Sequence, residues 1–305
     1  MSDKSILVTG GTGFIGSHLA KTLLMKGEKI VILTRPNSDF SRLEKFYGKF
    51  KTISYDDFMS GKIEFKIEGV IHLATYYQRF HEISEITNMI TANITVPTQV
   101  IEKALDYGAK FVLNTSTFFR YNLQNEIISE KMEVKPYNFY AATKVSFEKI
   151  LDFYSLEKGL RAITLVLFSP YGPHDNPVKL IPSVINNALT KKRMSLTDGT
   201  QRLDFTFISD IIRAYECGIS YMRNSVISGH EFFNIGSGRN YSINEVVSEI
   251  ERQIGITLSK SWDRKSVDSF RVRADNGKAK DRLGWTPDWD LTSGIRATVE
   301  SFKGE

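Results

Sequence analysis

Short apolar runs alternate with amphipathic segments through the first half of the chain. Apolar residues at helical spacing predict helices over Ser17–Lys26, Glu82–Tyr107 and Tyr140–Lys158. The runs between them predict strands at Ile6–Val8, Ile30–Leu33, Val70–Leu73, Phe111–Asn114 and Ala162–Leu167. Because strands that alternate with helices form a parallel sheet with helices on both faces, the pattern predicts a doubly wound α/β fold.

The alternation becomes less regular after Leu167, where a cluster of prolines predicts a long loop. Later patterns predict helices over Leu180–Lys191, from Asp210 and over Ser242–Ile254, and short strands at Phe205–Ile208 and Phe232–Ile235. Ser242 and Glu245 have the spacing of a capping box, and the charged segment Arg264–Trp289 is predicted to be irregular. We expect one domain over residues 1–168, joined by returning segments near 205–250, and a smaller α/β domain formed mainly by 169–305.

A glycine-rich turn follows the first predicted strand and opens into the first helix. It reads Thr9-Gly10-Gly11-Thr12-Gly13-Phe14-Ile15-Gly16. In dinucleotide-binding βαβ units, three such glycines make the tight turn, let the backbone approach a pyrophosphate and let helix and strand pack closely. The amides at a helix N-terminus also favour an anion. Gly10, Gly13 and Gly16 therefore predict a Rossmann-type dinucleotide site.

The end of the second strand distinguishes the two nicotinamide cofactors. An acidic residue there binds the ribose hydroxyls of NAD. Here Thr34 and Arg35 stand in its place, so no carboxylate repels a 2′-phosphate and a guanidinium can pair with one. The sequence therefore favours NADP(H) over NAD(H), with an Arg35 that is merely a surface charge as the alternative.

Charge and composition narrow the function classes. The 305 residues carry a net charge of +5 with both signs mixed, which does not indicate nucleic-acid binding but suits an anionic substrate such as a sugar nucleotide. Cys217 is the only cysteine, which excludes an intrachain disulfide and a cysteine-based metal site. The five histidines lack a metal-ligand spacing. With no secretory or transmembrane run, we expect no membrane partner and a cytoplasmic location.

A second motif, Tyr140-Ala141-Ala142-Thr143-Lys144, puts a phenol and an ammonium on one face of a helix. A reductase must give a proton to a carbonyl oxygen as hydride reaches the carbon. A phenol with its ordinary pKa of about 10 does this poorly at neutral pH, but a neighbouring ammonium and the positive nicotinamide lower that pKa by stabilising the phenolate. A hydroxyl from the end of the preceding strand, at Thr115, Ser116 or Thr117, would hold the carbonyl.

Together these motifs make the chain resemble the extended short-chain dehydrogenases/reductases that act on nucleotide sugars. The resemblance covers essentially the whole chain. Besides the glycine turn and Tyr140-x-x-x-Lys144, its markers are Ile71-His72-Leu73-Ala74, Asn93, the Thr115 region, Tyr171-Gly172-Pro173, Asp204-Phe205-x-x-Ile208-x-Asp210, Asn234-Ile235-Gly236 and Leu283-Gly284-Trp285-x-Pro287.

The resemblance implies roles for the matching residues. Thr115, Tyr140 and Lys144 would be catalytic, with Ser116 as the alternative to Thr115. Further substrate contacts would come from Ser116, Thr117 and Arg264. The aromatic segment Tyr76–His81 follows the third strand and is either another sugar contact or part of the packing of its loop. Together with Arg35 at the end of the second strand, the cofactor-binding set is Gly10, Thr12, Gly13, Phe14, Ile15, Gly16, Arg35, Asp56, Leu73, Ala74, Thr75, Asn93, Tyr140 and Lys144.

Three reactions compete within this family. Dehydratases usually carry Asp-Glu after the catalytic Thr, where this chain has Ser116-Thr117. Epimerases keep NAD bound and usually have the acidic residue that is absent at Thr34-Arg35. Reductases need only the Tyr, Lys and Thr set, and several segments are similar to those of enzymes that reduce a CDP-4-keto-3,6-dideoxyhexose.

We therefore expect NADPH-dependent reduction at C4 of a nucleotide-linked 4-keto-6-deoxy or 3,6-dideoxy sugar, CDP-linked by preference, in deoxysugar or O-antigen-type polysaccharide biosynthesis. Two alternatives stay open: a nucleotide-sugar 4-epimerase with bound NAD, and a non-catalytic NADP(H)-binding module. The resemblance also implies a homodimer that pairs the Glu82–Tyr107 and Tyr140–Lys158 helices of each subunit.

Overall fold

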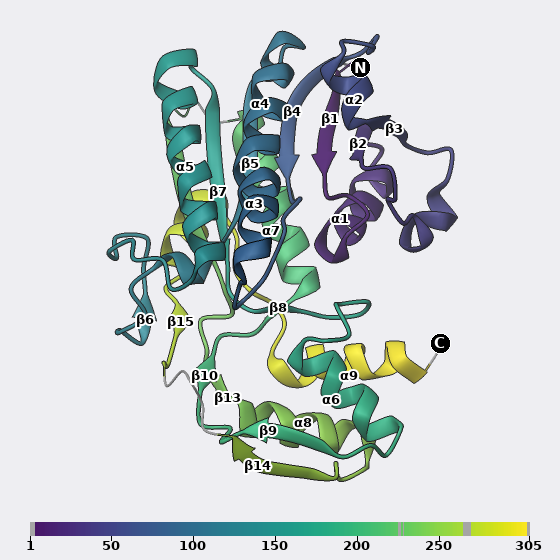
Figure 1. The fold of residues 1–305 in the computed structure, drawn as a ribbon, viewed down its shortest axis with the longest axis vertical. Helices are drawn as coiled ribbons and strands as arrows, with labels where there is room; N and C mark the ends of the chain where they lie inside the picture. Colours follow the sequence, from purple (N-terminus) through teal and green to yellow (C-terminus); the bar gives the residue numbers. More distant parts are fainter. Residues whose placement is uncertain (1–3, 225–226, 228, 265–269, 304–305) are drawn as a thin grey trace. The chain divides into compact units, whose positions relative to one another are not determined.

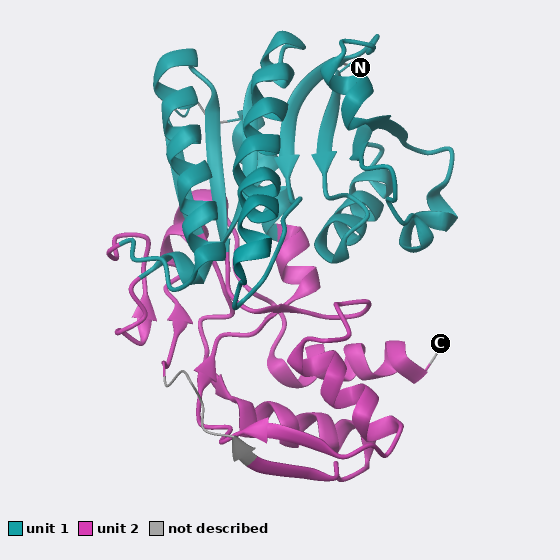
Figure 2. Cartoon of the chain, viewed as in Figure 1, with its two compact units in different colours: residues 1–121, 134–166, 214–233 teal, residues 122–133, 167–213, 234–305 magenta. Residues whose placement is uncertain are grey.

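The computed structural model describes residues 4–224, 227, 229–264 and 270–303. The chain divides into two compact units, which Figure 2 colours separately. Unit 1 comprises residues 1–121, 134–166 and 214–233, and unit 2 comprises residues 122–133, 167–213 and 234–305. The segment that returns to the first unit is thus 214–233, while 122–133, which lies inside the expected first domain, groups with the second unit.

A seven-stranded sheet organises the first unit (Figure 1). Its order is β12-β7-β5-β4-β1-β2-β3. The strands span Lys4–Thr9 (β1), Ile30–Thr34 (β2), Lys51–Ser54 (β3), Lys66–His72 (β4), Phe111–Thr117 (β5), Arg161–Leu167 (β7) and His230–Ile235 (β12). β1 pairs in parallel with both β2 and β4, which is the switch point where doubly wound folds bind ligands beyond the carboxyl ends of the strands. The predicted fold class is confirmed.

The helices of this unit begin and end close to the predicted bounds, except the one over Tyr55–Met59, which was not predicted. They span Phe14–Met25 (α1), Tyr55–Met59 (α2), Ile83–Ile90 (α3), Val96–Asp106 (α4), Phe139–Lys158 (α5) and Ile208–Asn224 (α7), whose last eleven residues belong to unit 1, with 3-10 turns at Ser41–Phe46 (η1) and Phe118–Arg120 (η3). The predicted helix Glu82–Tyr107 is divided into α3, the π-helical segment η2 (Thr91–Thr95) and α4. Pro97 lies in the first turn of α4, where its missing N–H costs least.

The described residues of the second unit form helices, including the first six residues of α7, and small two-stranded sheets. Its helices span Leu180–Leu189 (α6), Ile243–Ile254 (α8) and Leu291–Lys303 (α9), with a π-helical turn at Ala279–Leu283 (η4). Its strand pairs are β9 (Met194–Thr197) with β14 (Lys260–Arg264), β8 (Pro170–Tyr171) with β11 (Thr206–Phe207), β10 (Arg202–Leu203) with β13 (Tyr241–Ser242), and β6 (Ile127–Ile128) with β15 (Arg273–Ala274).

The predicted capping box of α8 is confirmed, because the Glu245 amide donates to the Ser242 hydroxyl at 3.1 Å and the Glu245 carboxylate accepts from the Ser242 amide at 2.7 Å. The prediction that 264–289 is irregular was wrong for β15 and η4. A two-residue strand and a five-residue π turn are too short to leave a periodic pattern.

Candidate active site

The glycine-rich turn joins β1 to α1 in unit 1. Gly10 has a φ of +69°, and a Cβ there would stand 2.6 Å from the Ala74 amide nitrogen. A Cβ on Gly16 would stand 2.0 Å from the Gly10 carbonyl oxygen. Both positions therefore require glycine. Gly13 is the exposed N-cap of α1 and has no side chain to cap the helix, so its positive end suits an anion.

The end of β4 is tied to the end of β1 beside this turn. The Thr9 hydroxyl accepts from the amides of Leu73 (3.3 Å) and Ala74 (3.2 Å). Arg35 is exposed just past β2, and Asp56 is exposed in the first turn of α2. A glycine cradle at the switch point and a cation at the end of β2 fit a nicotinamide dinucleotide, with the pyrophosphate at the turn.

The His72 side chain is buried at the end of β4. Its Nδ1 lies 2.8 Å from the Thr9 hydroxyl oxygen, which already accepts two amide hydrogens and has one proton left to donate. His72 therefore carries its ring proton on Nε2, which has no hydrogen-bond partner among the described residues. Burial, and then the charge of Lys144, hold the pKa of His72 well below its usual value, so the ring is neutral.

The phenol and the ammonium of the second motif lie near the start of α5. The helix is capped by the Asn138 side chain, which accepts from the Ala141 amide at 2.9 Å. Tyr140 is 9% exposed and Lys144 is 1% exposed. Burial raises the pKa of Tyr140 to about 12, and a side-chain hydrogen bond with Thr75 acts in the opposite direction. Burial likewise lowers the pKa of Lys144 to about 8.

The shift of Tyr140 is opposite to the one expected from the motif alone. That expectation counted the neighbouring ammonium and the positive nicotinamide, whereas burial of the phenol is the largest influence in the chain itself. At neutral pH the Tyr140 phenol therefore carries its proton.

Asn93, in the π-helical segment η2, holds the loop that follows β4. Its side-chain oxygen accepts from the Thr75 hydroxyl (3.1 Å) and the Tyr76 amide (2.8 Å). Its side-chain nitrogen donates to the Tyr76 carbonyl (2.9 Å) and the Thr143 hydroxyl (3.0 Å). All four of these hydrogen bonds of the fully buried Asn93 amide are made with the protein itself. They hold Thr75, which is a hydrogen-bond partner of Tyr140, against α5.

Aromatic side chains from the same loop lie over the start of α5. The Tyr77 ring stands edge-on to the Tyr140 ring, with 4.8 Å between centroids, and remains 47% exposed. His81 stacks on Phe139 at 4.6 Å. Tyr77 is therefore an exposed side chain in direct contact with the buried phenol, as a substrate contact from the predicted segment Tyr76–His81 would require.

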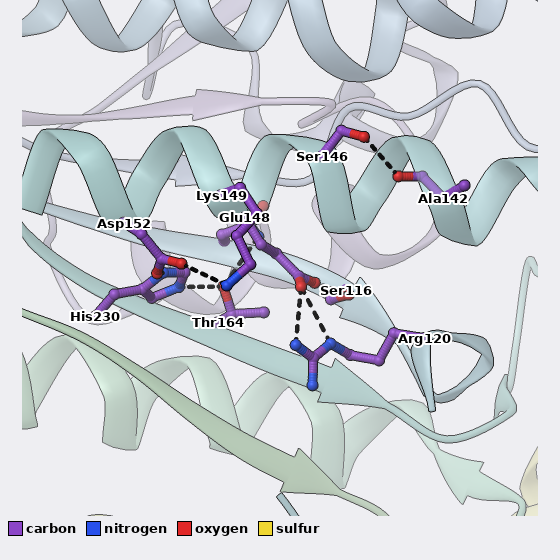
Figure 3. Close-up of polar contacts among 10 residues, drawn as sticks. Ser116, Arg120, Ala142, Ser146, Glu148, Lys149, Asp152, Thr164 and His230 are labelled. Carbon is purple, nitrogen blue, oxygen red and sulfur yellow. Dashed lines mark hydrogen bonds and ion pairs between the residues drawn. The ribbon is translucent and has the colours of Figure 1, made fainter. Parts of the chain in front are cut away.

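Ser116 points from β5 toward α5 (Figure 3). Its hydroxyl donates to the carboxylate of Glu148. The same carboxylate pairs with the Arg120 guanidinium at 3.0 Å, and both charged side chains are buried. Because Ser116 is 3% exposed and already donates its hydroxyl proton to Glu148, it is poorly placed to donate to a ligand.

Thr115 lies on the opposite face of β5 and is half-buried. Its hydroxyl donates to the His72 carbonyl at 2.8 Å, and the same oxygen lies 2.5 Å from the Tyr215 hydroxyl of α7. Thr117 instead caps η3, accepting from the Phe119 amide at 3.3 Å. Of the three predicted hydroxyls, Thr115 is thus the most accessible.

The comparison with known protein families agrees with this geometry. The family model described as "NAD dependent epimerase/dehydratase family" matches residues 6–236. The chain belongs to this family. The resemblance inferred from the motifs is therefore confirmed.

Family members of known name or structure match the chain over nearly its whole length. CDP-abequose synthase from Salmonella typhimurium is 27% identical over 309 residues, which cover 97% of each chain. UDP-glucuronate 4-epimerase from Thermodesulfobacterium geofontis is 30% identical and covers 97% of this chain and 95% of its own. The structure of UDP-glucuronic acid 4-epimerase from Bacillus cereus with UDP-glucuronic acid and NAD matches with a TM-score of 0.88 at 27% identity, covering 98% of this chain and 99% of that one. The names of these relatives all refer to nucleotide sugars.

The remaining predicted substrate contact, Arg264, ends β14 in unit 2, opposite Thr197 of β9. Its side chain lies outside the described residues, as does Asp268, which follows it in the motif.

Two residues of this site were not predicted from the sequence. Glu148 follows Lys144 by four positions on α5, so the helical spacing alone could have drawn attention to it. Tyr215 stands one hundred positions from Thr115 in the sequence, and no local pattern connects the two.

Proposed function

We propose that this enzyme uses NADPH to reduce the C4 keto group of a nucleotide-linked 4-keto-6-deoxy or 3,6-dideoxy sugar. The observation that carries the proposal is the acid–base set itself. Thr115, Tyr140 and Lys144 suffice for one proton transfer accompanied by hydride, and Ser116-Thr117 stand where a dehydratase has carboxylates. When bound, the nicotinamide supplies the hydride for C4.

The protonation states of the site support this direction of reaction. With a pKa of about 12, Tyr140 keeps its proton at neutral pH and can deliver it to O4 as negative charge develops there. Lys144, with a pKa of about 8, is mostly charged at pH 7 and stabilises the phenolate that Tyr140 becomes. Thr115, the accessible hydroxyl of β5, would donate to the carbonyl oxygen.

The cofactor preference follows from the end of β2. Arg35 is exposed and available to a 2′-phosphate, and the neighbouring Thr34 hydroxyl donates to the Ile53 carbonyl at 3.1 Å, so neither residue repels a phosphate. The similarity to CDP-abequose synthase supports a CDP-linked sugar as the first substrate to test.

A second candidate function is a nucleotide-sugar 4-epimerase with bound NAD. The observation in its favour is the similarity to UDP-glucuronate 4-epimerases, one of them solved with NAD and UDP-glucuronic acid. In this reaction Tyr140 would first accept the O4 proton and then return it.

The two candidates differ in whether the cofactor is consumed. The experiment follows oxidation of NADPH and of NADH with CDP-, dTDP- and GDP-linked 4-keto-6-deoxy and 3,6-dideoxy sugars. Rapid consumption that prefers NADPH with one of these sugars is the expected result. Interconversion of UDP-sugars without net consumption, by protein that retains NAD through purification, would replace the reductase with the epimerase.

A further inference from the structure

We infer that Tyr215 is a positioning residue for Thr115: its phenol donates a hydrogen bond to the Thr115 hydroxyl and turns the Thr115 proton toward the substrate oxygen. The inference rests on the proposed role of Thr115 at C4. It gives a function to a side chain that neither the motifs nor the acid–base set requires.

Tyr215 is fully buried in α7, and its hydroxyl oxygen lies 2.5 Å from the Thr115 oxygen. A buried phenol needs a hydrogen-bond partner, and here the partner is a proposed catalytic group. Burial raises the pKa of Tyr215, so its phenol keeps its proton over the whole working range and is a permanent donor.

The packing of α7 on β5 explains how this phenol reaches the site. A Cβ on Gly218 would stand 2.9 Å from Cδ2 of Leu113, so the missing side chain lets the helix approach the strand closely. Leu113 and Thr115 are two positions apart on β5 and share one face, whereas Ser116 points toward α5. Tyr215, three residues before Gly218, is thereby directed at Thr115.

The number of protons on the two hydroxyls sets the direction of the Tyr215–Thr115 hydrogen bond. The Thr115 hydroxyl has one proton and gives it to the His72 carbonyl, which can only accept. The short contact to Tyr215 must therefore carry the Tyr215 proton to the Thr115 oxygen. With that lone pair occupied, the Thr115 proton points away from α7, and a substrate carbonyl can take the place of the His72 carbonyl.

The hydrogen bond from Tyr215 also strengthens Thr115 as a donor. Hydrogen bonds in a chain polarise one another, so a hydroxyl that accepts one bond gives a stronger one. No covalent bond changes in this step, and Tyr215 and Thr115 both keep their protons. The effect belongs to the stage at which charge develops on O4, and it is therefore expected in kcat rather than in KM.

The test compares Tyr215→Phe with Tyr221→Phe, a matched change on the same helix. The Tyr221 hydroxyl lies 3.2 Å from a carboxylate oxygen of Glu231 and has no part in the proposed machinery. With the 4-keto sugar that the wild type reduces, Tyr215→Phe should lower kcat about tenfold, the worth of one hydrogen bond in a barrier, with KM nearly unchanged. Tyr221→Phe should leave kcat unchanged.

Two further variants separate positioning from mere packing. In a Thr115→Val background, Tyr215→Phe should cause no additional loss of kcat, because its only route to the substrate has gone. Replacement of Tyr215 by 3-fluorotyrosine, a stronger donor, should restore kcat to at least the wild-type value. A Tyr215→Phe enzyme that melts at a lower temperature but keeps its kcat, or additive losses in the double variant, would overturn the inference.

The outcome stays separable from the proposed function. If the wild type reduces no 4-keto sugar but interconverts UDP-sugars, the reductase fails while the same variants still test Tyr215, because Thr115 would again face O4. If no turnover is found, the 19F resonance of 3-fluorotyrosine at position 215 is compared with and without Thr115→Val. A resonance that does not move would refute the hydrogen bond and the inference with it.

Discussion

At the residue scale, the proposed pH range of activity depends on two buried charges, Lys144 and Glu148, which lie one turn apart on α5. Burial lowers the pKa of Lys144 to about 8, and the carboxylate of Glu148 opposes that fall. Glu148 is itself 1% exposed and is held by Arg120 and Ser116. The Lys144 ammonium, which we propose stabilises the Tyr140 phenolate, therefore depends on a neighbouring negative charge.

Glu148→Gln removes that charge while retaining the shape of the side chain. The pKa of Lys144 should fall below about 8, because the influence that raises it is lost. As pH rises, Lys144 should then lose its proton at a lower pH than in the wild type. The alkaline limb of the kcat/KM profile should therefore move to lower pH. Tyr140 does not titrate in this pH range, since its pKa is about 12.

The measurement is a pH profile of kcat/KM for the wild type and for Glu148→Gln. Glu157→Gln, an exposed change near the end of the same helix, is the control and should leave the profile in place. An alkaline limb that stays put or moves to higher pH in Glu148→Gln would contradict the electrostatic argument.

Tyr140→Phe tests whether the Tyr140 phenol is the proton donor in turnover. The variant loses the proton donor but keeps a ring for Tyr77 to contact. Turnover should fall by roughly 10²- to 10⁴-fold, the usual contribution of a general acid. Binding of NADPH, followed by its fluorescence, should change little. Undiminished turnover would remove Tyr140 from the mechanism.

The choice among the β5 hydroxyls shows the limit of prediction from the sequence. The sequence narrowed the proposed catalytic hydroxyl to Thr115 or Ser116 but could not choose between them, because the choice depends on which helix covers each face of β5. Ser116 faces Glu148 of α5, and Thr115 faces Tyr215 of α7. Only tertiary packing supplies these partners, whereas the glycine turn and the Tyr140–Lys144 spacing are local and were predictable.

At the scale of elements, α5 joins the site to a polar network on β12, β7 and β5, at one edge of the sheet (Figure 3). Asp152 of α5 lies 2.8 Å from Nδ1 of His230, and Nε2 of that ring lies 2.7 Å from the Thr164 hydroxyl. The Asn114 side chain donates to the same hydroxyl at 3.0 Å. One threonine on β7 thus connects α5 with β5 and β12.

Thr164→Val removes that central hydroxyl at nearly constant volume. His230 and Asn114 should each be left with a buried polar atom unpaired, which costs about 1–3 kcal/mol of unfolding free energy per group. Urea unfolding measures the loss, and Thr87→Val, an exposed change on α3, serves as the comparison. Equal midpoints for the two variants would mean that the network contributes nothing to stability.

The elements that the sequence predicted are those with a long periodic pattern. Strands such as β1 and β4 are buried on both faces, so their apolar runs stand out. Three strands were missed because they have few apolar residues and so leave no apolar run: β3, β9 and β14. The π-helical segment η2 was also missed, because it lies inside a continuous helical pattern and a single π turn leaves no separate signal in the sequence.

For the whole molecule, the sequence predicted the first unit better than the second. Unit 1 follows the regular alternation of strand and helix, whereas unit 2 gathers two-residue strands from three separate segments of the chain.

No helix among the described residues is long and apolar enough to cross a membrane. The described residues likewise hold no cluster of His, Cys, Asp and Glu able to bind a metal ion.

Large apolar side chains are exposed on α3 and α5, the two helices that the expected homodimer uses. Ile83 is 89% exposed and Leu156 79% exposed, with Ile90 and Phe153 also on the surface. Ile83 and Ile90 are seven positions apart, and Phe153 and Leu156 are three apart, so each pair shares one helix face. We propose that these faces are buried against a second copy of the chain, because monomers rarely expose contiguous apolar patches.

Leu156→Glu should convert the homodimer to a monomer. A charge placed in an apolar interface loses its hydration without gaining a partner, and two copies of it would face the same interface. Size-exclusion chromatography with light scattering gives the mass directly. Val178→Glu, at an equally exposed apolar position in unit 2, should remain dimeric. A wild type that is already monomeric, or a Leu156→Glu variant that stays dimeric, would mean that these residues serve another contact.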